Sequence, residues 1–194
     1  MSKFEQAINR FDALNAEDPN QDQDDHGRAL PKELLYAQRM SQCLDDYAPQ
    51  APEVLRLAVR CQHICRWRSA RSDYPTTREG YFRWRAELGK MHADIAAEVL
   101  RETGYDEPTI KRVRQLVRKL NRAADADVQC LEDVICLVFL RYYFDAFAAK
   151  HEDTKVIDIL RKTWGKMSAR AHEYALKLPF SDTGKQLVSQ ALAE

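Results

Sequence analysis

The segment over about 126–149 constrains the fold most, because its apolar side chains fall on opposite sides of a helix. Leucine, valine, isoleucine and aromatic residues recur at helical spacing at Leu131, Val134, Ile135, Leu137, Val138, Leu140, Tyr142 and Phe144. A helix that is apolar all round must be covered on all sides. We therefore expect a central buried helix at 126–149, enclosed by other helices.

Start and stop signals indicate that these other elements are also helices. Ser2-x-x-Glu5 and Thr76-x-x-Glu79 are capping boxes, and they predict helices that reach about residues 13 and 103. Proline and acidic caps predict further helices from Pro31, from Pro52 to about Trp67, from Asp106, from Asp125 or Asp127, from Asp153 or Thr154, and from Ser181. Seven prolines and six glycines are few for an all-β chain.

The expected fold is all-α, a single-domain bundle of about seven to eight helices over 1–180. Residues 15–30 are polar and predict a long loop, and residues 181–194 predict a short C-terminal helix and tail. We expect no signal peptide, because Ser2–Glu5 resembles a helix start and not an apolar segment, and the apolar run near Val134–Leu140 is too short to span a bilayer. These features predict a cytoplasmic protein with no membrane contact. The five cysteines form no CxxC pair, as expected for small buried side chains.

Charge is segregated along the chain although its net charge is zero. Residues 11–25 carry six acids and no lysine or arginine, whereas 56–90 carry nine basic residues against three acids, and 108–122 carry six basic residues and no acid. Two basic segments favour an anionic ligand, and the acidic stretch is a candidate for a loop that screens them.

Four ionisable side chains are candidates for catalysis or metal binding. Asp133 falls on an apolar side of the central helix beside Glu132, and a buried carboxylate must be paired, metal-bound or protonated. A structural pair with a neighbouring cation is the alternative for Asp133. His92 falls on the apolar stripe of its helix, where a core histidine is the alternative, and His63 lies on the opposite side of its helix from the main stripe.

Arginine next to aromatic residues suggests a site for phosphates or bases. Two such clusters occur, at 66–68 and 81–85, and the candidate ligand contacts are Arg66, Trp67, Trp84, Arg85 and Lys119. Arginines that only cover an apolar helix surface are the alternative. The common phosphate-loop, GxSxG and HExxH motifs do not occur in the sequence.

Four segments resemble the signature stretches of a family catalogued as domain of unknown function 4202. They are Gln62–Trp67 (QHICRW), Tyr81–Arg85 (YFRWR), Gln129–Tyr143 and Lys162–Ser168 (KTWGKMS). The likeness runs from about Phe4 to Phe180. This family implies no activity.

The order of the helices is also similar to that of the HD superfamily of metal-dependent phosphohydrolases. In that pattern the first histidine falls near Tyr36, the His-Asp doublet on Gln62-His63, the late aspartate on Glu132 or Asp133, and an extra histidine on His92. Tyrosine and glutamine are poor ligands for a divalent ion, and the central aspartate is absent. The resemblance implies a cleft that contains His63, His92, Glu132 or Asp133, and the arginines. In this cleft His63, His92 and Asp133 are expected either as ligands for Mn²⁺, Ni²⁺, Co²⁺ or Mg²⁺ or as acid–base groups.

The first functional hypothesis is a cationic cleft that binds a phosphorylated small molecule or nucleotide, with metal-dependent phosphoester hydrolysis as its reaction if the protein is an enzyme. The second is an RNA-binding or RNA-processing accessory protein. It requires that Lys111, Arg112, Arg114 and Arg118 share a face with Arg68, Arg71 and Arg83. The third is a scaffold for a protein partner. The sequence does not indicate the oligomeric state.

Overall fold

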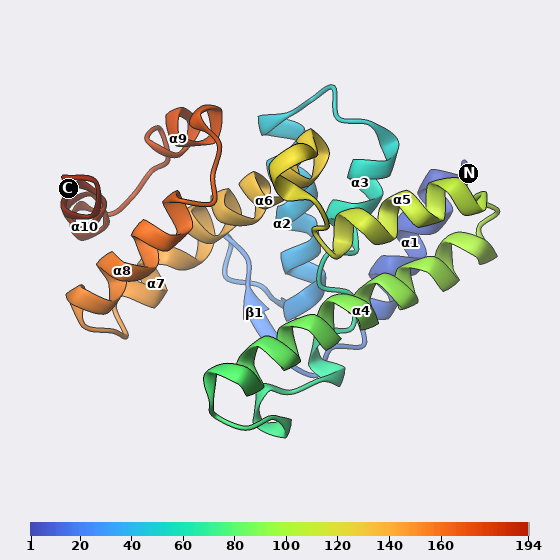
Figure 1. Ribbon diagram of the computed structural model, residues 1–194, viewed down its shortest axis with the longest axis horizontal. Coiled ribbons are helices and arrows are strands. Elements are labelled where there is room, and N and C mark those ends of the chain that lie inside the picture. The colour runs from blue at the N-terminus through green and yellow to red at the C-terminus, as the bar shows by residue number, and fades with distance from the viewer. Residues whose placement is uncertain (194) are drawn as a thin grey trace. The chain divides into compact units, whose positions relative to one another are not determined.

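The computed structural model describes residues 1–193 and is built almost wholly from helices (Figure 1). Its α-helices are α1 (Lys3–Asn15), α2 (Lys32–Tyr47), α3 (Glu53–Arg60), α4 (Arg78–Glu102), α5 (Glu107–Val117), α6 (Ala126–Val138), α7 (Phe144–Ala148), α8 (Asp153–Trp164), α9 (Ala169–Ala175) and α10 (Asp182–Leu192). Within these residues the strands are β1 (Gln21–Gln23) and β2 (Ala29–Pro31), which pair antiparallel. The all-α class is confirmed.

The helices group into two compact units, the first over Met1–Leu120 and the second from Asn121 onward. The expected single domain over 1–180 stays a prediction. Among residues 1–193, no helix combines the length and the apolar character that a bilayer crossing requires.

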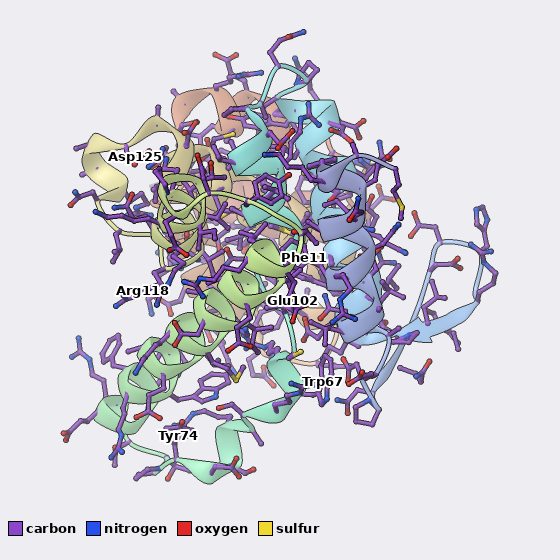
Figure 2. The ribbon with its side chains drawn as sticks, turned by 90° about the vertical axis from the view of Figure 1, so that its right-hand side faces the viewer. Phe11, Trp67, Tyr74, Glu102, Arg118 and Asp125 are labelled. Carbon is purple, nitrogen blue, oxygen red and sulfur yellow. The ribbon has the colours of Figure 1, made fainter. Side chains whose placement is uncertain are left out.

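In the first unit α4 packs along α5, α5 packs against α3, and α1 contacts α2, α3 and α4 (Figures 1 and 2). Large apolar side chains from each of these helices are fully buried in one core, among them Phe11, Leu44, Leu57, Leu100 and Leu116. Burial of each such side chain contributes roughly 1.5–3 kcal/mol to folding. This core fixes the ends of α3, α4 and α5 relative to one another.

The capping signals locate most helix starts correctly. Ser2 and Glu5 form the expected capping box, and Asp106 and Asp125 cap α5 and α6. The start of α4 is one residue later than predicted, because the Thr77 hydroxyl, not that of Thr76, accepts the bond from the Gly80 amide.

The predicted helix from Pro52 to Trp67 is wrong in its second half. Helix α3 ends at Arg60, and a 3₁₀ turn follows over Arg66–Arg68. The chain changes direction at Cys65, whose φ of 55° is left-handed and incompatible with a continuing α-helix. The Cys65 amide donates to the Asn15 side-chain oxygen at 3.1 Å, and this buried bond fixes the turn.

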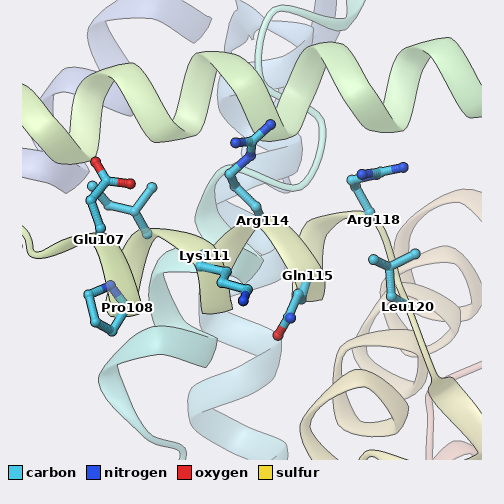
Figure 3. Close-up of a pocket in the computed structure, with 8 residues that line it drawn as sticks. Glu107, Pro108, Lys111, Arg114, Gln115, Arg118 and Leu120 are labelled. Atoms are coloured by element: carbon cyan, nitrogen blue, oxygen red, sulfur yellow. The ribbon is translucent and has the colours of Figure 1, made fainter.

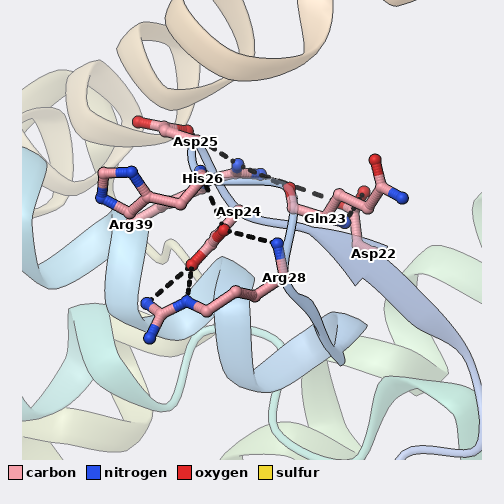
Figure 4. Close-up of polar contacts among 7 residues, drawn as sticks. All are labelled: Asp22, Gln23, Asp24, Asp25, His26, Arg28 and Arg39. Carbon is pink, nitrogen blue, oxygen red and sulfur yellow. Dashed lines mark hydrogen bonds and ion pairs between the residues drawn. The ribbon is translucent and has the colours of Figure 1, made fainter.

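The polar stretch 15–30 is not wholly a loop, because it contains the β1–β2 hairpin (Figure 4). The Asp24 carboxylate accepts bonds from the backbone amides of His26 and Arg28 and from the Arg28 guanidinium. The Arg39 guanidinium donates to the Gln23 carbonyl at 3.0 Å and to Asp25 at 3.1 Å. Polar contacts thus hold the hairpin together. Its sequence lacks the alternating apolar residues by which strands are recognised, and the prediction therefore missed it.

In the second unit α8 packs against α10, α6 contacts α9, and α7 contacts α8 and α10. Helix α6 is buried around most of its circumference, as expected, and continues through a π-helical segment at Phe139–Tyr143 into α7. The helical path therefore ends at Ala148, close to the predicted 149. Helix α9 is missing from the sequence prediction, because its seven residues are too few to show a clear periodicity.

Candidate functional site

A pocket of about 260 Å³ opens in the first unit where the turn after α3, the middle of α4 and the end of α5 meet. It is lined by Gln62, His63, Arg66, Arg85, Ala86, Leu88, Gly89, His92, Val117, Arg118 and Lys119. We call it the cationic pocket, because four of these residues are lysine or arginine and none is acidic.

Local backbone geometry brings these side chains together. Arg85, Gly89 and His92 share one side of α4 because they are three to four residues apart. The left-handed Cys65 turns the chain after α3, and the left-handed Lys119 (φ 54°) turns it after α5. Non-glycine residues with positive φ are strained and cluster at functional sites. Of the three non-glycine residues with positive φ in the described chain, Lys119 lines this pocket and Cys65 directly precedes the lining residue Arg66.

Two imidazoles lie side by side in the pocket. The His63 and His92 rings are 5.8 Å apart between centroids, and Tyr36 stacks on His63 at 4.4 Å with an interplanar angle of 13°. His92 Nδ1 lies 2.7 Å from the Ile64 carbonyl oxygen. A carbonyl only accepts hydrogen bonds, so Nδ1 of His92 carries the proton.

Both imidazoles are neutral at physiological pH. Burial lowers the pKa of His92 to about 4, and the positive charges of Arg66 and Arg85 act in the same direction. Burial also lowers the pKa of His63 well below its ordinary value, assisted by Arg66, His92, Arg85 and Lys119. The surrounding cations therefore create a positive potential in which a further cation is disfavoured and an anion is stabilised.

Glu33, in the first turn of α2, supplies a carboxylate beside two of the lining residues. Its Oε2 lies 3.6 Å from His63 Nδ1, and its Oε1 lies 3.9 Å from Arg66 Nε. Burial raises the pKa of Glu33 to about 7, although Arg66 and Lys32 oppose the shift. Sequence reasoning missed Glu33. Its spacing of three residues from Tyr36, which places both on one side of α2, was the available signal.

Three buried polar atoms at this pocket lack a hydrogen-bond partner, and all belong to lining residues. They are Oε1 of Gln62, Nη1 of Arg66 and Nε2 of His92. Leaving a buried polar group unpaired costs about 1–3 kcal/mol, and native proteins rarely do so without a reason. Gln62 is a further residue that was not among the sequence candidates, because only burial distinguishes it from a surface glutamine.

The two tryptophan candidates are not among the residues that line the pocket. Trp84 is only 8% exposed, its indole N–H donates to the Ser69 carbonyl at 3.1 Å, and the Arg66 guanidinium lies 5.1 Å from its ring. Trp67 is half-buried, with Arg68 at 5.8 Å from its ring. Trp84 therefore contacts Arg66 from outside the pocket and helps to position its guanidinium group.

The acidic candidates Glu132 and Asp133 lie on α6 in the second unit, and both are buried. The Asp133 carboxylate accepts bonds from the Ser168 amide at 2.8 Å, from the Ser168 hydroxyl at 2.6 Å and from the Gln129 side-chain amide at 2.9 Å. Ser168 in turn caps α9 through the Ala171 amide. Asp133 thus secures the start of α9.

Of the predicted metal ligands, His63 and His92 line the cationic pocket in the first unit, and Asp133 belongs to the second unit. Among residues 1–193, no cluster of three or more histidine, cysteine, aspartate or glutamate side chains has the geometry to hold an ion. The charge at the cationic pocket also favours an anion over a divalent ion. The metal site stays a prediction.

A larger, open groove of about 780 Å³ runs along α5 (Figure 3). Lys111 and Gln115 point away from α4, whereas Arg114 points toward it and pairs with Asp94 at 2.5 Å. Arg118 lines both this groove and the cationic pocket.

The acidic stretch 11–25 screens part of the first basic segment. Asp12 forms a two-bond pair with the Arg60 guanidinium at 2.7 and 2.6 Å, and Glu17 pairs with Arg68 at 3.2 Å. Neither arginine lines the cationic pocket. The cations that remain directed into the pocket are therefore a specific subset of the basic residues.

Comparison with known proteins places the chain in a family. No match was found among curated proteins or among solved structures. The family model described as Domain of unknown function (DUF4202) matches residues 5–188, which is nearly the whole sequence. The chain therefore belongs to the DUF4202 family.

Proposed function

We propose that the cationic pocket binds a small phosphorylated molecule. The observation that carries this proposal is the convergence of Arg66, Arg85, Arg118 and Lys119 on one pocket that has no acidic lining residue, in a chain whose net charge is zero. Guanidinium groups match the geometry of phosphate oxygens and bind them through charge-assisted bonds. The unpaired Nη1 of Arg66 offers a buried donor for such an oxygen.

The size of the pocket limits the ligand to a compact molecule. Pockets for drug-sized ligands measure about 300–1,000 Å³, and this one is smaller, at about 260 Å³. Because Trp84 is covered by Arg66, stacking of a nucleotide base on that ring is not part of the proposal. Metal-dependent phosphoester hydrolysis stays a prediction. The candidate acid–base groups at the pocket are the neutral His63 and Glu33, whose Oε2 lies 3.6 Å from His63 Nδ1.

Two arginines on α4 give a matched test. Arg85 lines the pocket, whereas Arg83 is exposed and pairs with Glu87 at 2.8 Å. Arg85→Gln should weaken binding of phosphate compounds about tenfold or more, the effect of losing one charge-assisted hydrogen bond. Arg83→Gln should leave the affinity unchanged.

Isothermal titration calorimetry with inorganic phosphate, sugar phosphates and nucleoside monophosphates measures both variants against the wild type. Equal weakening by both substitutions would indicate a diffuse surface effect and contradict the proposal. An absence of binding to every phosphate compound by the wild-type protein would remove it.

RNA binding is the alternative that the groove on α5 favours, because Lys111, Arg114 and Arg118 line it. Several cations of this hypothesis are already paired, Arg114 with Asp94, Arg68 with Glu17 and Arg83 with Glu87. Binding to RNA that weakens steeply with salt would support this alternative, since phosphate contacts release counterions.

A further inference from the structure

The proton on His92 determines what kind of ligand atom the pocket can accept. Nδ1 of His92 donates to the Ile64 carbonyl at 2.7 Å, and burial holds the ring neutral. A neutral imidazole carries one proton, so Nε2 is a bare acceptor. This nitrogen is buried and has no hydrogen-bond partner in a side chain that is only 2% exposed.

Gln62 provides a second acceptor in the same pocket. Its Oε1 is buried and has no partner, and the residue is 4% exposed. The pocket therefore offers two kinds of unpaired group to a ligand. Arg66 Nη1 needs an acceptor, whereas Gln62 Oε1 and His92 Nε2 need donors.

A ligand that only accepts hydrogen bonds would satisfy Arg66 Nη1 and neither of the two acceptors. Displacing water from a buried acceptor without replacing its hydrogen bond lowers affinity. A fully ionised phosphate, pyrophosphate or sulfate would leave both acceptors unpaired. A ligand that carries hydroxyl groups close to its phosphate would satisfy both kinds of group, because the hydroxyls donate to the acceptors and the phosphate binds the cations.

We infer that the ligand of the cationic pocket is a phosphorylated polyol or sugar, whose phosphate contacts Arg66 and Arg85 and whose hydroxyls donate to Gln62 Oε1 and His92 Nε2. This inference rests on the proposed function and names the class of ligand for the same site. In this arrangement Gln62 and His92 select for ligands with hydroxyl groups, and Arg66 and Arg85 provide most of the affinity for the phosphate.

Matched pairs of ligands that differ only in hydroxyl groups test the inference on the full-length protein. Suitable pairs are glycerol 3-phosphate with propyl phosphate, ribose 5-phosphate with 2-deoxyribose 5-phosphate, and glucose 6-phosphate with 2-deoxyglucose 6-phosphate. Calorimetry should show at least one pair in which the hydroxylated member binds about tenfold more tightly, since a hydrogen bond contributes up to about tenfold in affinity. Gln62→Met should reduce that ratio, while Gln115→Met, on the α5 groove, should leave it unchanged.

The outcomes separate the two claims. If both members of every pair bind equally well, or if Gln62→Met leaves the ratio intact, the assignment of donors is wrong while the phosphate pocket stands. If no phosphate compound binds, both claims fail. Thermal denaturation of Gln62→Met, together with its affinity for inorganic phosphate, verifies that the variant is folded.

Discussion

Gly89 stands out at the residue scale, because it lies inside the continuous 25-residue helix α4 and lines the cationic pocket. A Cβ at this position would meet no atom within 4 Å. Gly89→Ala should therefore stabilise the fold by about 0.5–1 kcal/mol, the difference in helix propensity. Gly89→Leu should extend into the pocket and lower ligand affinity at least tenfold. Thermal denaturation and calorimetry measure the two effects, and wild-type affinity in Gly89→Leu would contradict this position for the ligand.

Gly104 provides the control, because it follows the same helix but adopts a φ of 81°. A Cβ here would also meet no atom within 4 Å, so only the backbone conformation matters. Gly104→Ala should destabilise the protein by roughly 1 kcal/mol and leave ligand affinity unchanged.

The sequence identifies part of the site and misses the rest for a physical reason. Charge and helical spacing indicate Arg66, Arg85, His63 and His92, all of which line the pocket. Gln62 is uncharged, so its importance arises only from burial without a partner, which a sequence does not show.

At the scale of the elements, two helices begin in the same way. Ser168 caps α9 and donates to Asp133, and Ser181 caps α10 and donates to Asp145 at 2.8 Å. The first pair is largely buried, with Asp133 only 2% exposed, whereas Ser181 and Asp145 are exposed.

Comparison of the two caps gives a prediction about stability. Ser168→Ala should cost about 2 kcal/mol, because it removes a cap and leaves the buried Asp133 with fewer donors. Ser181→Ala should cost about 1 kcal/mol or less, since water can replace the hydroxyl. Urea denaturation measures both, and an equal loss in the two variants would show that burial of Asp133 has no effect.

Helix starts were easier to predict than helix ends. Side-chain caps such as Ser2 and Asp106 leave a local signature. The chain turns after α3 at the left-handed Cys65, a conformation that residue propensity does not predict. It is held by the hydrogen bond that the Cys65 amide donates to the side chain of Asn15, fifty positions earlier.

For the whole molecule, buried Glu33 makes stability depend on pH. Its pKa is about 7 when folded against an ordinary value near 4.5, so the folded state holds a proton that the unfolded state has released. The contribution to stability is complete below pH 4.5 and is lost as pH rises to 7. Glu33→Gln should therefore gain about 2 kcal/mol relative to the wild type at pH 8 and little at pH 4.5. The same difference at both pH values, measured by urea denaturation, would argue against a protonated Glu33.

The two histidines act in the opposite direction. Because burial lowers the pKa of His92 to about 4, and that of His63 also falls, their contribution is present above pH 6.5 and is lost on acidification. Glu33 offsets part of this loss in the wild type between pH 4.5 and 6.5. As the pH is lowered from 6.5 to 4.5, the free energy of unfolding of Glu33→Gln should consequently fall more steeply than that of the wild type.

Every residue that lines the cationic pocket belongs to the continuous stretch 62–119. Slowed amide hydrogen exchange on ligand binding should therefore centre on three nearby peptides, from the turn after α3, the middle of α4 and the end of α5. The first of these peptides also depends on the start of the chain, because the Asn15 side chain holds the turn after α3 and Tyr36 stacks on His63. A ligand that tightens the pocket should therefore also slow amide exchange at the end of α1 and the first turns of α2.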